Sequence, residues 1–178
     1  MKSISGGRGE VNVRAAREGD LDNLVELKHK LDEYHELPGL WPPIGGRRRT
    51  FARYRKMLHQ RTARLLVAER SPHRIVGYLT ATIQTRECPD RDFRRVGMIG
   101  ETFVDIEHRR HGVGTLLVGA ARRFFSSRGI KHVTLRNAVG NRLANEFWEG
   151  LSFEPVLYTR TTTIKKLATA IRTRKLRI

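Results

Sequence analysis

The stretch FVDIEHRRHGVGTLLVGAARRFF, residues 103–125, constrains the fold more than any other part of the chain. An apolar strand-like segment passes through a charged turn into Gly112 and Gly114, and then directly into a helical pattern. The first turn of such a helix carries unpaired N–H groups and the positive end of the helix dipole, so it favours an anion. Three positive or protonatable residues precede the glycines: Arg109, Arg110 and His111. Because glycines let an anion approach the backbone, the stretch predicts a strand, a pyrophosphate-binding loop and a helix.

The glycine pair also has a simpler interpretation, because two glycines one residue apart can serve only to make a tight turn. Two known phosphate-binding motifs are excluded. Leu117 stands where a dinucleotide-binding fingerprint needs its third glycine, and no GxxxxGK[ST] sequence occurs in the chain. A phosphate-binding turn and a purely structural turn therefore both stay open on this stretch alone.

Apolar periodicity divides the rest of the chain into short strands and helices. The expected strands are residues 11–16, 65–69, 75–85, 96–106, 132–138 and 153–164, and the expected helices are residues 19–37, 47–64, 113–127 and 141–151. Hairpins in the middle and strand–helix–strand units at the end imply an α/β fold, with one mixed, mostly antiparallel sheet flanked by helices. We expect a single domain over residues 11–164, between a flexible lead-in, 1–10, and a basic tail, 165–178.

Two segments resemble the GNAT superfamily of acetyl-CoA-dependent N-acetyltransferases. The first, RRHGVG, fits that family's R/Q-x-x-G-x-G/A signature, with Arg109, Gly112 and Gly114 on its fixed positions. The second, NRLANEFWEGLSF, is similar to a downstream family segment at five residues: Asn141, Ala144, Phe147, Trp148 and Phe153. The chain also departs from the pattern, with Arg110 and Ser152 at positions where glycine is common and Trp148 where many members carry tyrosine.

The resemblance implies the family fold, in which the central strand splays from its neighbour and admits acetyl-CoA. The pantetheine arm would pair with main-chain groups of that strand like an added β-strand, and the glycine loop would hold the pyrophosphate. It implies this set of cofactor-binding residues: Thr102, Phe103, Val104, Arg109, Arg110, His111, Gly112, Val113, Gly114, Thr115 and Asn141. The implied reaction transfers an acetyl group from acetyl-CoA, a co-substrate, to a primary amine of a small molecule or peptide, by direct attack in a ternary complex.

Direct attack requires the protein to remove a proton from the amine, stabilise an oxyanion and protonate the leaving thiolate. Glu101 is the candidate base, through a water molecule, because it is the only carboxylate in the apolar segment VGMIGETFV. A solvated or salt-bridged strand residue is the alternative. A backbone N–H near Val104 is the candidate for stabilising the oxyanion. Trp148 has no transferable proton, so Tyr158, Tyr78 and solvent stay open as sources of the thiolate's proton.

The chain is strongly basic, with 35 Lys and Arg against 18 Asp and Glu and a formal net charge of +17. This charge favours anionic partners such as phosphates, nucleic acid or acidic surfaces. Two alternatives to the enzyme follow: a nucleic-acid- or ribosome-associated binding module on the same fold, and a non-catalytic acyl-CoA-binding regulator. The first is not favoured, because the basic clusters lack an exposed aromatic platform and no known nucleic-acid-binding motif occurs.

The two expected N-terminal helices differ in charge. Seven of the 18 acids fall between Glu18 and Glu36, whereas residues 47–64 hold eight Lys and Arg and no acid. In the family these helices border the acceptor, so the acidic helix could receive a cationic amine, and the basic one an acidic substrate or cofactor phosphates. Two solvated charged faces are the alternative, and the acceptor stays unidentified.

Several other kinds of site are not expected. The sequence HRRH, residues 108–111, lacks the helical spacing of a paired-histidine metal site, so we expect no metal. The single Cys88 cannot form an intramolecular disulfide. No export-type apolar segment and no run of about 18 apolar residues occurs, so we expect a cytoplasmic protein with no membrane partner. A homodimer is left open.

Overall fold

The computed structural model describes residues 10–34, 46–70, 74–87, 94–157, 160 and 162–175. It divides the chain into two compact units. The first comprises Met1–Leu37 and Trp41–Arg136, and the second comprises Pro38–Leu40 and Asn137–Ile178.

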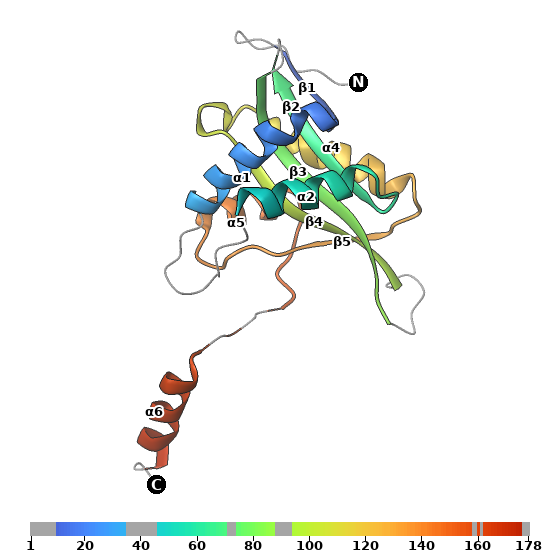
Figure 1. Ribbon diagram of the computed structural model, residues 1–178. Helices are drawn as coiled ribbons and strands as arrows, with labels where there is room; N and C mark the ends of the chain where they lie inside the picture. The colour runs from blue at the N-terminus through green and yellow to red at the C-terminus, as the bar shows by residue number, and fades with distance from the viewer. Residues whose placement is uncertain are drawn as a thin grey trace. The chain divides into compact units, whose positions relative to one another are not determined.

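The first unit is built on a sheet whose strands lie in chain order (Figure 1). Among the described residues it has five strands: β1 (Val11–Ala15), β2 (Ala63–Arg70), β3 (Arg74–Thr85), β4 (Arg95–Val104) and β5 (His132–Leu135). The pairs from β1 to β4 are antiparallel, whereas β5 runs parallel to β4. A parallel neighbour needs a crossover connection, and a helix between β4 and β5 supplies it. The mixed, mostly antiparallel sheet expected from the sequence is confirmed.

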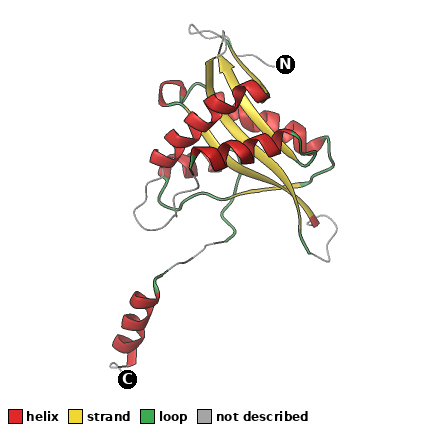
Figure 2. Cartoon of the chain, in the orientation of Figure 1, coloured by secondary structure: helices red, strands yellow, loops and turns green. Residues whose placement is uncertain are grey.

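Helices cover both faces of this sheet (Figures 1 and 2). Helices α1 (Leu21–Tyr34) and α2 (Arg47–Leu58) lie side by side on one face, and the crossover helix α4 (Val113–Ser126) lies on the other. Alternate residues of a strand point to opposite faces, so β2 contributes Leu65 and Val67 to the core beneath α1 and α2. On the other face, the ring of Phe125 in α4 packs so close to Gly97 of β4 that an added Cβ would lie 2.9 Å from it.

The second unit contains helix α5 (Arg142–Glu149) and helix α6 (Ile164–Lys175). Asn141 caps α5, because its Oδ1 accepts a hydrogen bond of 3.1 Å from the N–H of Ala144. The buried Trp148 ring packs edge-on against two neighbouring rings of the same unit, those of Phe147 and Phe153.

The prediction of a strand over 153–164 is wrong for its described residues, since 153–157 form no regular element and α6 begins at Ile164. Pro155 cannot donate to a ladder, which keeps such a run out of a sheet interior. Residues of the expected basic tail belong to α6, whose Ile164, Leu167 and Ile171 side chains are exposed.

Candidate active site

An irregularity in the pairing of β3 with β4 fixes where Glu101 points. Leu79 pairs with Thr102 and Ala81 pairs with Ile99, so Thr80 alone faces both Gly100 and Glu101. This two-against-one arrangement is a β-bulge. An added Cβ at Gly100 would lie 2.5 Å from the Thr80 hydroxyl oxygen, which explains the glycine.

The bulge reverses the alternation of side chains along β4. Gly97 faces α4, whereas Phe103, six residues later, belongs to the core beneath α1 and α2. In a regular strand two residues an even number apart share a face, so the extra residue at Gly100–Glu101 accounts for the change. Glu101 consequently lies on the same face as Phe103, towards α1 and α2, where it meets partners from both helices.

The same point of β4 is where β5 leaves it. The parallel pairing runs from Val96 with His132 to Ile99 with Leu135 and goes no further. Within the described residues the β5 side of β4 therefore has no strand partner beyond Ile99, which gives the splay expected of the central strand. A hollow of about 230 Å³ opens here, lined by Gln84, Met98, Ile99, Gly100 and Arg136.

The free edge of β4 offers backbone groups of particular residues. The N–H of Asp105 donates to the Val76 carbonyl of β3 at 2.9 Å, so by alternation the backbone of Phe103 also faces β3. The backbones of Thr102 and Val104 then face the free edge. Of these groups, the Val104 carbonyl accepts a hydrogen bond of 2.9 Å from Nε of Arg109.

The loop between β4 and α4 has two residues in the left-handed region, Arg110 at φ 63° and Gly112 at φ 76°. Gly112 precedes the first residue of α4, where left-handed backbone favours glycine. The Arg109 guanidinium, besides its bond to Val104, lies 5.6 Å from the centre of the Phe103 ring, so it fastens the loop to the strand. The left-handed glycine thus lies next to the free edge.

The first turn of α4 follows with Val113, Gly114 and Thr115. The carbonyl of Gly112 accepts the first hydrogen bond of the helix, from the N–H of Leu116 at 3.0 Å. The N–H groups of Val113, Gly114 and Thr115 therefore have no acceptor within the helix. The exposed His111 ring lies beside this turn, with Nδ1 2.6 Å from the Arg109 carbonyl. The helix terminus and its basic rim are therefore suited to an anion.

On the face of β4 that α1 and α2 cover, the Glu101 carboxylate is the centre of a polar cluster. Both of its oxygens accept hydrogen bonds from Nη2 of Arg53, at 2.7 and 2.9 Å, and Oε2 accepts another of 2.8 Å from the Tyr54 hydroxyl. Lys28 of α1 lies 3.8 Å away and is 2% exposed. It is also paired with Asp32, one turn further along α1. The sequence-level alternative for Glu101, a salt-bridged strand residue, thus describes its contacts.

Two tyrosines extend this cluster into the core. The Tyr54 hydroxyl lies 3.2 Å from that of Tyr78, and since Tyr54 gives its proton to Glu101, Tyr78 donates to Tyr54. Burial, and then the charge of Glu101, raises the pKa of Tyr54 far above its ordinary value. Burial likewise raises the pKa of Tyr78. Burial alone would lower the pKa of Arg53, but the charge of Glu101 and its hydrogen bonds outweigh that effect and raise it.

The predicted site residues thus fall into three groups. Most of them, Glu101 to Val104 and Arg109 to Thr115, belong to one strand–loop–helix segment of the first unit. Asn141 belongs to the second unit and is a helix cap, and Tyr158 lies outside the described residues. Tyr78, the alternative acid, is fully buried, so its hydroxyl reaches Glu101 only through Tyr54.

Sequence reasoning missed three members of the Glu101 cluster: Lys28, Arg53 and Tyr54. Helical periodicity marks Tyr54 as core without revealing its polar partner, and a buried lysine looks like any other helix residue in sequence. The glycine inside the strand, Gly100, is the one available signal, because an isolated glycine in a strand suggests a bulge.

A family profile described as "Acetyltransferase (GNAT) family" matches residues 29–153, well over half of the sequence. The chain belongs to the GNAT acetyltransferase family. This confirms the resemblance found in the two motifs, and the fold agrees with it.

Individual relatives agree with this assignment. An uncharacterised N-acetyltransferase of Methanocaldococcus jannaschii is 41% identical over 61 residues, 34% of this chain and only 27% of that relative's length. A crystal structure of an acetyltransferase of Trypanosoma brucei is 26% identical, with a TM-score of 0.65 over 86% of this chain and 99% of that one. The aminoglycoside N-acetyltransferase AAC(6')-Iy in complex with CoA shares the fold, with a TM-score of 0.70 at 18% identity, over 92% of this chain and 98% of that one.

Across the described ranges no group of three or more His, Cys, Asp and Glu side chains is placed to hold a metal ion. Nor does any helix in those ranges have the length and apolar character needed to cross a membrane.

Proposed function

We propose that this acetyltransferase uses acetyl-CoA and transfers the acetyl group to a primary amine of a small molecule or peptide, by direct attack in a ternary complex. The observation that carries the proposal is the place where three features meet on β4. Within the described ranges its edge has no strand partner beyond Ile99, and its C-terminal end leads into the loop with left-handed Gly112. At the bulge, Glu101 points from β4 towards α1 and α2.

Acetyl-CoA would bind through backbone groups. The N–H groups of Val113, Gly114 and Thr115 and the adjoining loop suit the pyrophosphate, because they combine unpaired donors with the positive end of α4. The free-edge backbone of Thr102 and the Val104 carbonyl, which can accept a second hydrogen bond beside that of Arg109, suit the amide groups of the pantetheine arm, which would add to β4 as a further strand. Arg109 would support both by holding the loop against the strand.

In the transfer step, the neutral amine attacks the thioester carbonyl, a C–N bond forms and the carbonyl oxygen becomes an oxyanion. The N–H of Val104 on the free edge is the proposed donor to that oxyanion. Collapse of the intermediate breaks the C–S bond, the amine's extra proton passes to Glu101 through a water molecule, and the CoA thiolate takes a proton from solvent or a nearby acid. Glu101 then returns its proton to solvent.

Calorimetry with CoA, together with thiol release from acetyl-CoA and an amine panel, tests this proposal. Gly112→Leu would place a side chain in the loop and should abolish CoA affinity. Gly129→Leu is the matched control, because Gly129 also has positive φ, 68°, but lies beyond the opposite end of α4, about 20 Å away along the helix. Equal loss of CoA affinity in both variants, or none in either, would remove the loop from the binding site.

A further inference from the structure

We propose that the acceptor is an amine accompanied by carboxylate or phosphate groups, rather than a polycation such as an aminoglycoside. This inference rests on the proposed function, because it places the acceptor's amine near Glu101. It comes from the distribution of charge on the two helices that cover Glu101.

The carboxylates that could receive a polycation are already paired with basic side chains of the protein. Among the described residues, the ion pairs on and around α1 and α2 are Glu18 with Arg55 and His59, Glu26 with Arg47, Asp32 with Lys28, Glu33 with His29, Glu101 with Arg53 and Lys28, and Asp105 with Lys30. Asp22, an α1 acid outside these pairs, lies six residues before Lys28, about 9 Å along the helix. A cationic acceptor would therefore have to compete with the protein's own lysines and arginines.

Helix α2 carries a row of three cations, and the middle one meets Glu101. Arg49, Arg53 and Lys56 are spaced at i, i+4 and i+7, so they form one stripe about 10 Å long. Arg53, in the middle, is bonded to Glu101. Arg49 and Lys56 are exposed, and within the described part of the chain no ion pair joins either to a carboxylate. This stripe is the excess positive charge around the cluster.

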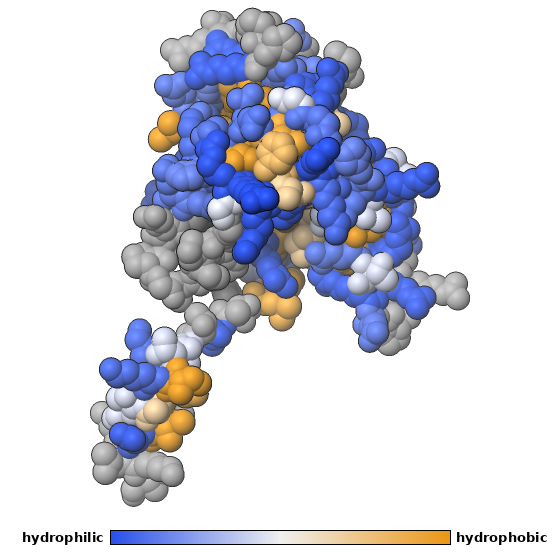
Figure 3. Space-filling model, in the orientation of Figure 1, coloured by the Kyte–Doolittle hydropathy of each residue, from blue (hydrophilic) through white to orange (hydrophobic). Residues whose placement is uncertain are grey.

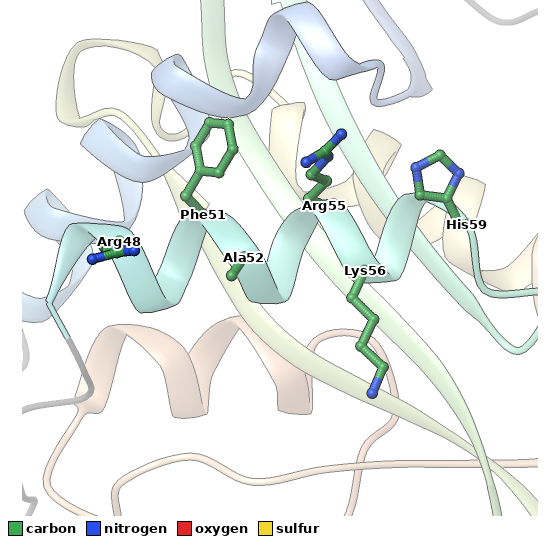
Figure 4. A pocket seen from close by; sticks show the side chains of 6 residues that line it. All are labelled: Arg48, Phe51, Ala52, Arg55, Lys56 and His59. Atoms are coloured by element: carbon green, nitrogen blue, oxygen red, sulfur yellow. The ribbon is translucent and has the colours of Figure 1, made fainter.

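Lys56, at one end of this row, also lines a hollow on the outer surface of α2. In Figure 4, Phe51 and Arg55 point towards α1, whereas Lys56 points away from it. An open hollow of about 570 Å³ is lined by Arg48, Phe51, Ala52, Arg55, Lys56 and His59, and Figure 3 shows apolar surface (orange) among hydrophilic side chains (blue) over α1 and α2. This hollow lies along the outer surface of α2, and Arg55 on its α1 side is neutralised by Glu18. Arg49 and Lys56 therefore supply unneutralised charge on either side of Arg53, the α2 cation that reaches Glu101.

The spacing of the stripe defines where the acceptor's anionic groups would lie. Arg49 and Lys56 are about 6 and 5 Å along the helix from Arg53, so anions roughly 5–10 Å from the reacting amine would meet them. In an extended peptide each residue advances about 3.3 Å, so acids at the second and third positions after a free N-terminus would fit. Phosphate groups at the same distance would meet the same side chains.

Matched acceptors provide the test. The peptides Ala-Glu-Glu, Ala-Gln-Gln and Ala-Lys-Lys, each with an amidated C-terminus, differ mainly in charge. Ala-pSer-pSer separates phosphate from carboxylate, and kanamycin serves as the polycation. Both kcat/KM from thiol release and the Kd from calorimetry with CoA present should favour Ala-Glu-Glu over Ala-Lys-Lys by about tenfold at low salt. Each surface charge pair contributes up to about fivefold, and two pairs are involved.

Two charge-reversed variants show whether the stripe is responsible. Arg49→Glu/Lys56→Glu should remove or reverse the preference, whereas Arg122→Glu/Arg123→Glu, with the same change in net charge on exposed residues of α4, should keep it. Equal affinity for the acidic and basic peptides, a preference for Ala-Lys-Lys or kanamycin, or equal effects of both variants would overturn the proposal. If acidic peptides bind preferentially but CoA does not bind and no thiol is released, the proposed function fails while the charge preference stands.

Discussion

The substitution Glu101→Gln should lower both stability and turnover, and a second substitution can separate the two effects. Gln keeps the size of the side chain and its hydrogen-bond acceptor but removes the charge that faces Lys28. Lys28 is 2% exposed, so it cannot move into solvent as the 42%-exposed Arg53 can. It keeps Asp32 as its remaining partner.

The size of the stability effect follows from the geometry. At the 3.8 Å between Lys28 Nζ and Glu101 Oε1, two unit charges attract by about 4 kcal/mol at an effective dielectric constant of 20. Asp32 recovers part of this, so we expect a loss of about 2–3 kcal/mol in the free energy of unfolding and a fall in Tm of roughly 5–10 °C. Turnover should fall by about 10²-fold or more if Glu101 is the base.

Lys28→Met/Glu101→Gln removes the unpaired charge and should restore stability to within about 1 kcal/mol, because a buried ion pair can often be replaced by uncharged groups at little cost. Its turnover should remain as low as that of Glu101→Gln. Denaturant unfolding and initial rates of thiol release, measured on the wild type, both single variants and the double variant, give the full cycle. If turnover recovers together with stability, Glu101 only organises the cluster and the base lies elsewhere.

Three further predictions follow from individual contacts. Gly97→Ala should lower the free energy of unfolding by about 1–3 kcal/mol and leave kcat unchanged, because the new methyl group would meet the buried Phe125 ring at 2.9 Å. Denaturant unfolding measures the stability, and thiol release measures kcat. An unchanged unfolding midpoint would contradict the packing argument. Tyr54→Phe removes the hydroxyl group that donates to Glu101 and should lower the free energy of unfolding by about 1–2 kcal/mol. Denaturant unfolding checks this, and a variant as stable as the wild type would contradict it. Burial, and then the charges of two neighbouring arginines, lower the pKa of His108 in the folded protein. The unfolded chain therefore binds a proton at His108 more readily than the folded protein does. The free energy of unfolding should have its full value above about pH 6.5 and decline as the pH falls below it. Thermal unfolding at pH 7.5 and 5.5 should show this decline in the wild type and a smaller one in His108→Gln; equal declines would assign the effect to other groups.

Much of the architecture could be predicted because it depends on local patterns. The strand pair Ala63–Arg70 and Arg74–Thr85 and the helix Val113–Ser126 have strong periodicity, and the turn at Gly112 has a residue suited to its backbone. The error at 153–164 arose where β-branched and aromatic residues suggested a strand. Such residues favour a sheet only if a neighbouring strand pairs with them, and that depends on tertiary structure.

The site was predicted less completely than the fold, for a related reason. The proposed cofactor-binding residues 102–104 and 109–115 lie close together along the chain, so short-range patterns can mark them. The partners of Glu101 come from positions 28, 53 and 54, brought together only when α1 and α2 pack on β4. Their charges also change the interpretation of the acidic helix, because acids that look available in sequence are paired in the structure.

The β-bulge means that β4 is one residue longer than the sheet requires. Without Gly100, Thr80 would pair with Glu101, and the flanking pairs Leu79 with Thr102 and Ala81 with Ile99 would join in a regular ladder with every side chain on its present face. A shortened chain would thus keep its core and its hydrogen bonds, but would lose the bend at the point where β5 departs. The ladder and the opening therefore make separate demands on this strand: the ladder would close without Gly100, whereas the bend beside β5 requires the extra residue.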